Sequence, residues 1–132
     1  MRLVLTSGCF DLLHVGHIRH LHEAKRMGDY LVVGLTRDAH VNKLGRPIIP
    51  EAERKEMLEA LECVNDVMLC DDSIESLTYW KPNIFCKGHD RKKIGLLPEE
   101  LKICEERDIE IRFTKPNPQT TTQIVERIRC AS

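Results

Sequence analysis

Two histidines, His14 and His17, lie three residues apart just after a short apolar strand predicted at residues 3–7. The same stretch predicts the start of a helix, so both imidazoles would point to one face of its first turn. A helix N-terminus has unpaired N–H groups and the positive end of the helix dipole, and both attract anions. Gly8 and Gly16 would let the chain turn and a ligand approach closely. The segment therefore predicts a phosphate-binding site.

The same histidines could instead cap the helix or bind a metal ion. A zinc site needs three or four protein ligands. His20 could join His17, but no cysteine or carboxylate lies at ligand spacing beside them. We therefore expect no metal held by these side chains.

The six cysteines occur without a Cys-x-x-Cys pair, at Cys9, Cys63, Cys70, Cys86, Cys104 and Cys130. A scattered set of this kind is typical of free thiols in a reducing compartment, several of them buried as small apolar side chains. Cys9 differs from the others because it lies beside the predicted phosphate site, at a helix entry where a thiolate could be stabilised. We expect a cytosolic protein.

Strands and helices are predicted to alternate along the chain. Apolar runs predict strands at residues 3–7, 30–35, 66–69, 84–87 and 109–113. Amphipathic patterns predict helices at residues 15–27, 51–61, 73–80, 98–107 and 121–129, with Ser73 as a helix cap and Met57, Leu58 and Leu61 facing inward. Strands separated by helices predict an α/β fold, a doubly wound parallel sheet covered on both faces. Ligands of such sheets bind at the carboxyl ends of the strands.

Length and charge limit the classes of partner. The 132 residues suit a single domain, residues 1–132. Lys and Arg number 20 against 21 Asp and Glu, a net charge of -1, so no overall field favours nucleic acid or an anionic membrane. No apolar run approaches the ~20 residues of a membrane-spanning helix, and Met1 and Arg2 lead directly into a strand. We therefore expect neither a nucleic-acid nor a membrane partner.

The segment from Gly8 to His17 resembles the His-x-Gly-His signature of the cytidylyltransferase-like nucleotidyltransferases. Further resemblances follow in the family's order. Residues 31–38 resemble its second strand and the acidic residue after it, and Arg54 with Leu58 resembles its "E-x-R" helix. Residues 87–90 resemble the Lys-Gly-Gly-Asp of heptose 1-phosphate adenylyltransferases, with His89 in place of a glycine, and residues 120–124 resemble the Ser-Thr-Thr-x-Ile that opens the last helix. The resemblance covers nearly the whole chain. It implies a Rossmann-like sheet of five strands in the order 3-2-1-4-5.

The resemblance also implies a reaction. A substrate phosphate would attack the α-phosphorus of ATP or CTP and pyrophosphate would leave, with no covalent enzyme intermediate at Cys9. His14 and His17 would stabilise the charge that develops. Lys43 and Arg46 stand where the family places mobile basic residues over the phosphates, although a solvated loop is the alternative.

The remaining site residues divide by ligand. We expect the nucleotide to contact Gly8, Cys9, Phe10, Gly16, Lys87, Gly88, Asp90, Thr120, Thr121 and Thr122. We expect the substrate to contact Asp11 and Asp38, although either could be a plain capping or turn residue. The triphosphate would hold most of the coordination of Mg²⁺. Nucleotide choice would depend on residues 87–95 and 114–122, whose pattern leaves ATP and CTP open.

Three kinds of function remain. A nucleotidyltransferase acting on a small phosphorylated metabolite fits the pattern best, and family habit implies a homodimer. Arg46-Pro47 and Pro50 resemble the heptose enzymes, whereas glycerol 3-phosphate cytidylyltransferases lack these prolines and have an Arg at the position of Lys115. A sugar 1-phosphate is therefore the favoured acceptor and glycerol 3-phosphate the alternative; FAD synthetases and phosphopantetheine adenylyltransferases also belong to the family. An inactive nucleotide-binding module and a structural interaction domain are the other two kinds.

Overall fold

The computed structural model describes residues 1–90, 92, 95–116 and 120–131. Within them, strands and helices alternate as the sequence predicts. In chain order they are β1 (Leu3–Gly8), α1 (Val15–Arg26), β2 (Tyr30–Thr36), the 3-10 turn η1 (Asp38–His40), α2 (Glu51–Glu59), β3 (Asp66–Cys70), α3 (Ser73–Trp80), β4 (Ile84–Lys87), α5 (Pro98–Glu106), β5 (Glu110–Phe113) and α6 (Thr121–Ala131).

The sheet is parallel throughout and has the order β3-β2-β1-β4-β5. This confirms both the fold class and the strand order expected from the sequence. The order reverses at β1, the strand that ends at Gly8. The chain after β1 leads to α1 on one face of the sheet and the chain after β4 leads to α5 on the other, so a crevice forms beyond the carboxyl ends of these two strands, as in other doubly wound folds.

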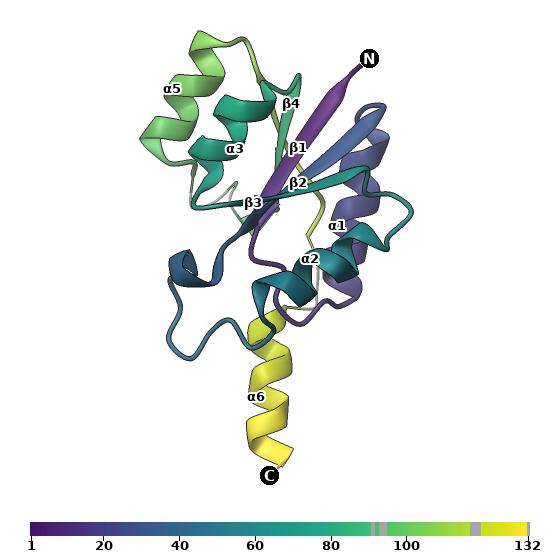
Figure 1. Ribbon diagram of the computed structural model, residues 1–132, viewed down its shortest axis with the longest axis vertical. Coiled ribbons are helices and arrows are strands. Elements are labelled where there is room, and N and C mark those ends of the chain that lie inside the picture. Colours follow the sequence, from purple (N-terminus) through teal and green to yellow (C-terminus); the bar gives the residue numbers. More distant parts are fainter. Residues whose placement is uncertain (91, 93–94, 117–119, 132) are drawn as a thin grey trace.

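Apolar side chains pack on both faces of the sheet. One face buries Val4, Val33 and Ile84 against Leu21 of α1 and Leu58 of α2. The other face carries Leu5, Val32 and Phe85, which pack against Leu77 of α3 and Cys104 of α5. Figure 1 shows α3 and α5 on one side of the sheet and α1 and α2 on the other.

Helix α6 differs from the others because it has no buried residue. Figure 1 shows it extending away from the sheet, beyond the edge where the loop after β1 and the loop before α2 also lie. Within the described part of the chain, none of the helices has the length and apolar character that crossing a bilayer requires.

Two local predictions were wrong. The cap of α3 is Asp72, whose side chain accepts a hydrogen bond from the Glu75 N–H, and Ser73 is the first helical residue. Met57 is 37% exposed, whereas Arg54 is fully buried on the same helix together with Leu58. A charged residue can occupy the interior only when partners satisfy its donors, and single-residue hydrophobicity does not reveal those partners.

Candidate functional site

The carboxyl ends of β1, β2 and β4 bring most of the predicted site residues to one edge of the sheet. The loop after β1 leads to His14, η1 after β2 begins with Asp38, and β4 ends at Lys87. Helix α6 joins them because the Thr121 hydroxyl donates to the main-chain oxygen of Asp11, 2.9 Å away. Residues 91, 93, 94 and 117–119, which fall within the predicted nucleotide-selecting segments, lie outside the described residues.

The two histidines cap α1 with their Nδ1 atoms. The Gly16 N–H donates to Nδ1 of His14 at 3.0 Å, and the His14 N–H donates to Nδ1 of His17 at 3.3 Å. A nitrogen that accepts a hydrogen bond carries no proton, so each neutral ring has its proton on Nε2. The rings stack with their centroids 3.8 Å apart. Capping therefore leaves two neighbouring Nε2–H donors for an anion at the helix N-terminus.

Both rings are held in the neutral form. Burial lowers the pKa of His14 below its ordinary value. Burial, together with the nearby rings of His14 and His20, lowers the pKa of His17 to about 3. Burial likewise lowers the pKa of His20 to about 4. At neutral pH these side chains act as hydrogen-bond donors without a formal charge.

These shifts predict a loss of stability in mild acid. In the unfolded chain a histidine titrates near pH 6.5. Below that pH the unfolded state therefore binds protons at His17 and His20 that the folded state does not bind, which favours unfolding. The free energy of unfolding should be at its full value above about pH 6.5 and fall by roughly 2–4 kcal/mol by pH 5. Urea denaturation at pH 7.5 and pH 5 measures the change. A His17→Asn variant should show a smaller change, and an equal change in that variant would contradict the assignment.

The loop between β1 and α1 is backbone-strained. Phe10 and Leu12 adopt the left-handed conformation, with φ of 48° and 51°. Such conformations cost roughly 1–3 kcal/mol in non-glycine residues and persist only where the surroundings enforce them. Phe10 is 6% exposed and packs in the core, and its ring lies 5.2 Å from that of His17. The loop is therefore a fixed platform for the histidines.

Asp11 connects the loop between β1 and α1 to the basic loop before α2, which carries Lys43 and Arg46. Its carboxylate is fully buried and accepts hydrogen bonds from the Arg46 Nε, at 2.7 Å, and from the N–H groups of Ile48 and Ile49, at 2.8 and 2.9 Å. Burial alone would raise the pKa of Asp11, but these donors hold it below its ordinary value. Substrate contact by Asp11 remains a prediction, whereas its contacts to the loop are direct.

Arg54 also holds the loop between β1 and α1 in place. Its guanidinium donates to the oxygens of Ile49, Cys9 and Asp38, at 2.8, 2.6 and 2.6 Å. Asp38 in turn exchanges hydrogen bonds with Glu51, each carboxylate accepting from the other residue's N–H. Arg54 thus connects the loop after β1 to the segment before α2, and Asp38 is engaged with protein partners while its side chain remains 40% exposed.

The two predicted loop cations occupy different environments. Lys43 is exposed, whereas the Arg46 side chain is 9% exposed against Asp11. Arg46 is therefore anchored, where the sequence predicts a mobile cation. A cavity of about 240 Å³ separates this loop from α6, and its lining includes Lys43, Arg46, Thr122 and Arg129.

Thr120 caps α6. Its hydroxyl accepts from the Gln123 N–H, and its own N–H donates to the Gln123 side chain, both at 3.1 Å. Capping uses the Thr120 oxygen, whereas the exposed Thr122 hydroxyl lines the cavity. Phosphate contact by the threonines remains a prediction.

Lys87 has a buried partner that the sequence did not indicate. Its Nζ lies 3.3 Å from a carboxylate oxygen of Glu100, which also accepts from the Ser73 hydroxyl at 2.7 Å. Burial by itself would raise the pKa of Glu100, but the Ser73 hydroxyl, Lys87 and the Leu97 N–H lower it overall. At the following turn, a side chain on Gly88 would approach the Asp90 carboxylate to 2.9 Å. The turn is therefore tight, and ligand contact by Lys87, Gly88 and Asp90 remains a prediction.

All six cysteines are described, and each is a free thiol, with Cys70, Cys86 and Cys104 buried. Cys9 is half-buried beside the histidines, and its main-chain oxygen is held by Arg54. Among the described residues, no group of three or more His, Cys, Asp or Glu stands close enough to hold a metal ion.

Sequence reasoning missed the polar cluster of His20, Thr6 and Thr114. Thr6 and Thr114 are 0% and 3% exposed, and their hydroxyls lie 2.7 and 2.8 Å from the two ring nitrogens of His20. A threonine in the middle of an otherwise apolar central strand was the available signal, because a buried hydroxyl requires a partner.

Comparisons with known proteins show which proteins this chain is similar to. The family model described as cytidylyltransferase-like matches residues 5–127. Two proteins named "Bifunctional protein HldE" are similar: that of Geotalea uraniireducens is 42% identical over 139 residues, and that of Pelobacter propionicus is 39% identical over 132 residues. The matches include 99% and 96% of this chain but only 28% and 27% of those proteins. The chain therefore spans little more than a quarter of these relatives.

A solved structure, the lipopolysaccharide core biosynthesis protein from Thermoplasma volcanium, superposes with a TM-score of 0.75 at 30% identity. The superposition covers 89% of this chain and 98% of that one. The similarity thus extends over nearly the full length of a structure of the same architecture.

Proposed function

Because the chain belongs to the cytidylyltransferase-like family of nucleotidyltransferases, we propose that it joins a nucleoside monophosphate from ATP or CTP to a small phosphorylated metabolite and releases pyrophosphate. A phosphate oxygen of the acceptor attacks the α-phosphorus, the bond to the bridging oxygen breaks, and pyrophosphate leaves with the electron pair. A phosphate monoester is already ionised near neutral pH, so the reaction needs no general base.

The observation that carries this proposal is the pair of Nε2–H donors at the N-terminus of α1. The triphosphate lies against this N-terminus, and its charge grows on oxygens that His14 and His17 can reach. Fixed donors of this kind stabilise a transition state without reorganising, because the capping hydrogen bonds already hold them in place. Lys43 and Thr122 line the neighbouring cavity and supply further positive charge and a hydroxyl donor to the phosphates.

We expect Mg²⁺ to enter with the nucleotide. Triphosphate oxygens and water would hold the ion, which neutralises phosphate charge when bound. The carboxylate of Asp11, in the loop that leads to the histidines, already accepts three hydrogen bonds from the protein. Because the Asp11 carboxylate is already engaged in this way, the site suits a Mg²⁺ ion that is held by the nucleotide.

The favoured acceptor is a sugar 1-phosphate. The support comes from Arg46-Pro47, from Lys87-Gly88, and from Lys115, where the glycerol 3-phosphate enzymes have Arg. A relative named for lipopolysaccharide core biosynthesis, the assembly of a glycan, points in the same direction.

A pyrophosphate-release screen tests activity and acceptor together. ATP and CTP are each paired with sugar 1-phosphates, with glycerol 3-phosphate and with the unphosphorylated sugars as blanks. Release should be faster with a sugar 1-phosphate. A preference of about tenfold or more for glycerol 3-phosphate with CTP, ~1.4 kcal/mol of transition-state discrimination, would promote the polyol enzyme instead.

We also propose that the chain acts as a homodimer in the cytosol. Leu44 and Ile48 in the basic loop and Ile128 on α6 are at least 49% exposed, and a second copy could remove this apolar surface from water. A solution mass equal to one chain, measured by light scattering, would contradict the dimer.

A further inference from the structure

Helix α1 has few apolar anchors where it carries the histidines. Its buried residues are Gly16, Leu21 and Ala24. The two buried apolar side chains, Leu21 and Ala24, therefore lie in the second half of the helix, whereas the only fully buried residue of the first turn is Gly16. Apolar packing of α1 itself therefore contributes little to holding its first turns against the sheet, and the capping hydrogen bonds at His14 and His17 do not reach the sheet.

His20 makes that connection. It follows His17 by three residues, so the two side chains lie on the same side of the helix. One ring nitrogen of His20 meets the hydroxyl of Thr6 on β1, and the other meets the hydroxyl of Thr114, which directly follows β5. The Phe10 ring is close to both imidazoles, with its centroid 5.2 Å from that of His17 and 6.4 Å from that of His20.

The hydrogen-bond directions follow from proton counting. The Thr6 hydroxyl donates its single proton to the Cys86 oxygen of β4, at 2.9 Å. It must therefore accept from His20, so the proton of the neutral ring is on Nε2. Nδ1 is then an acceptor, and the Thr114 hydroxyl donates to it. A lowered pKa agrees with a neutral ring, although the assignment rests on the geometry.

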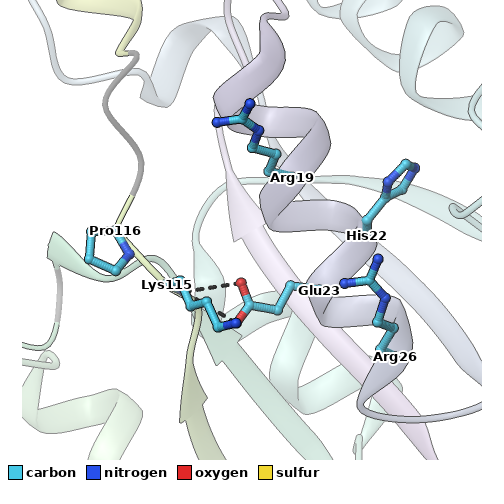
Figure 2. A pocket seen from close by; sticks show the side chains of 6 residues that line it. All are labelled: Arg19, His22, Glu23, Arg26, Lys115 and Pro116. Atoms are coloured by element: carbon cyan, nitrogen blue, oxygen red, sulfur yellow. Dashed lines mark hydrogen bonds between the residues drawn. The ribbon is translucent and has the colours of Figure 1, made fainter.

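Thr114 itself is fixed from two further sides. Its N–H donates to the Lys87 oxygen at the end of β4, at 3.0 Å. The next residue, Lys115, donates its N–H to both carboxylate oxygens of Glu23, at 3.2 and 3.0 Å, one turn further along α1. Figure 2 shows the hydrogen bonds between Lys115 and Glu23 of α1. The network thus links α1 to the middle of β1 and to the carboxyl ends of β4 and β5.

We propose that His20 is a positioning residue, which as a neutral Nε2–H imidazole bridging Thr6 and Thr114 fixes the first two turns of α1 and hence the two histidines of the proposed nucleotidyl transfer. This inference rests on the proposed function for its kinetic consequence, but the positions of His14 and His17 can be measured without activity. A displacement of about 1 Å at a reacting centre can cost about 100-fold in rate.

The experiment compares Thr114→Val, which removes the hydroxyl without changing the shape, with Thr114→Ser, which retains it. Thr114→Val should lower kcat about tenfold or more while KM for the nucleotide changes less than about threefold, and Thr114→Ser should stay within about threefold of the unmodified chain. Thr78→Val, the same substitution at an exposed position on α3, is the control and should change neither.

Nitrogen NMR of the imidazoles supplies the independent readout. In the unmodified protein, His20 should show a protonated Nε2 and an unprotonated Nδ1, and no variant is needed for this measurement. Thr114→Val should shift the ring resonances of His14 and His17, whereas Thr78→Val should not. A proton on Nδ1 of His20 overturns the proposal. So does a Thr114→Val protein that loses thermal stability but keeps both kcat and the resonances of His17. If the unmodified chain releases no pyrophosphate, the proposed function fails, while the NMR comparison still decides the role of His20.

Discussion

Replacing His14 with alanine should lower kcat by about 100-fold or more, because one of two aimed donors at the phosphate site is lost. The structure adds a second consequence. His14 is the N-cap of α1 and accepts from the Gly16 N–H, so alanine also removes a cap worth about 1 kcal/mol of stability. Steady-state kinetics and thermal unfolding of the purified variant measure the two effects.

A matched variant separates catalysis from capping. Asparagine is a good N-cap but has no Nε2–H donor at the position of the imidazole. His14→Asn should therefore retain nearly the full melting temperature and still lose kcat about 100-fold. His17→Asn should lose a similar factor. If His14→Asn remains within a few fold of the unmodified chain, the ring serves only as a cap and the catalytic assignment is wrong.

The largest effect on stability is expected from Arg54→Met. Arg54 is fully buried, and its loss leaves the oxygens of Ile49 and Cys9 without their donor. Removing one partner from a buried network of this kind costs about 3–5 kcal/mol. The strained loop at Phe10 and Leu12 would also lose its support, so activity should fall in the protein that remains folded. Urea denaturation and pyrophosphate release measure the two outcomes.

Lys55→Met is the control on the same helix. Lys55 is 37% exposed and pairs with Glu59 one turn away, an arrangement worth no more than about 0.5 kcal/mol. Arg54→Lys should lie between the two variants, because an ammonium cannot reach three acceptors in the fork arrangement of a guanidinium. Equal losses in Arg54→Met and Lys55→Met would show that the buried network contributes little.

The fold could be predicted from local patterns because alternating apolar runs and amphipathic segments define elements one at a time. The apolar run of β2 and the pattern of α1 each indicate their own burial, and the strand order followed from the resemblance of motifs in sequence order. The exceptions arose where a polar side chain took an interior place. Arg54 is buried on α2 while Met57 remains exposed, because the acceptors of Arg54 come from the loop after β1 and from the segment before the helix.

The sequence could predict which residues lie at the candidate site, but not which groups they form hydrogen bonds with. His14 and His17 were recognisable from their spacing, yet their capping geometry, which determines the tautomers, required the backbone. Arg46 looked like a free loop cation because its partner, Asp11, lies 35 residues earlier in the chain. Glu100 and His20 were missed for the same reason, since their hydrogen-bond partners lie on other elements.

The reciprocal hydrogen bonds between Asp38 and Glu51 also bear on how this protein can change over evolution. They pin the two ends of the segment that joins η1 to α2, and Asp11 fastens its last part at Ile48 and Ile49. At its tip, Leu44 is fully exposed and a side chain on Gly45 would meet no atom within 4 Å. Doubling the length of an exposed loop costs only ~0.6 kcal/mol of closure entropy. Insertions at this tip can therefore accumulate at the rim of the cavity without unravelling the fold.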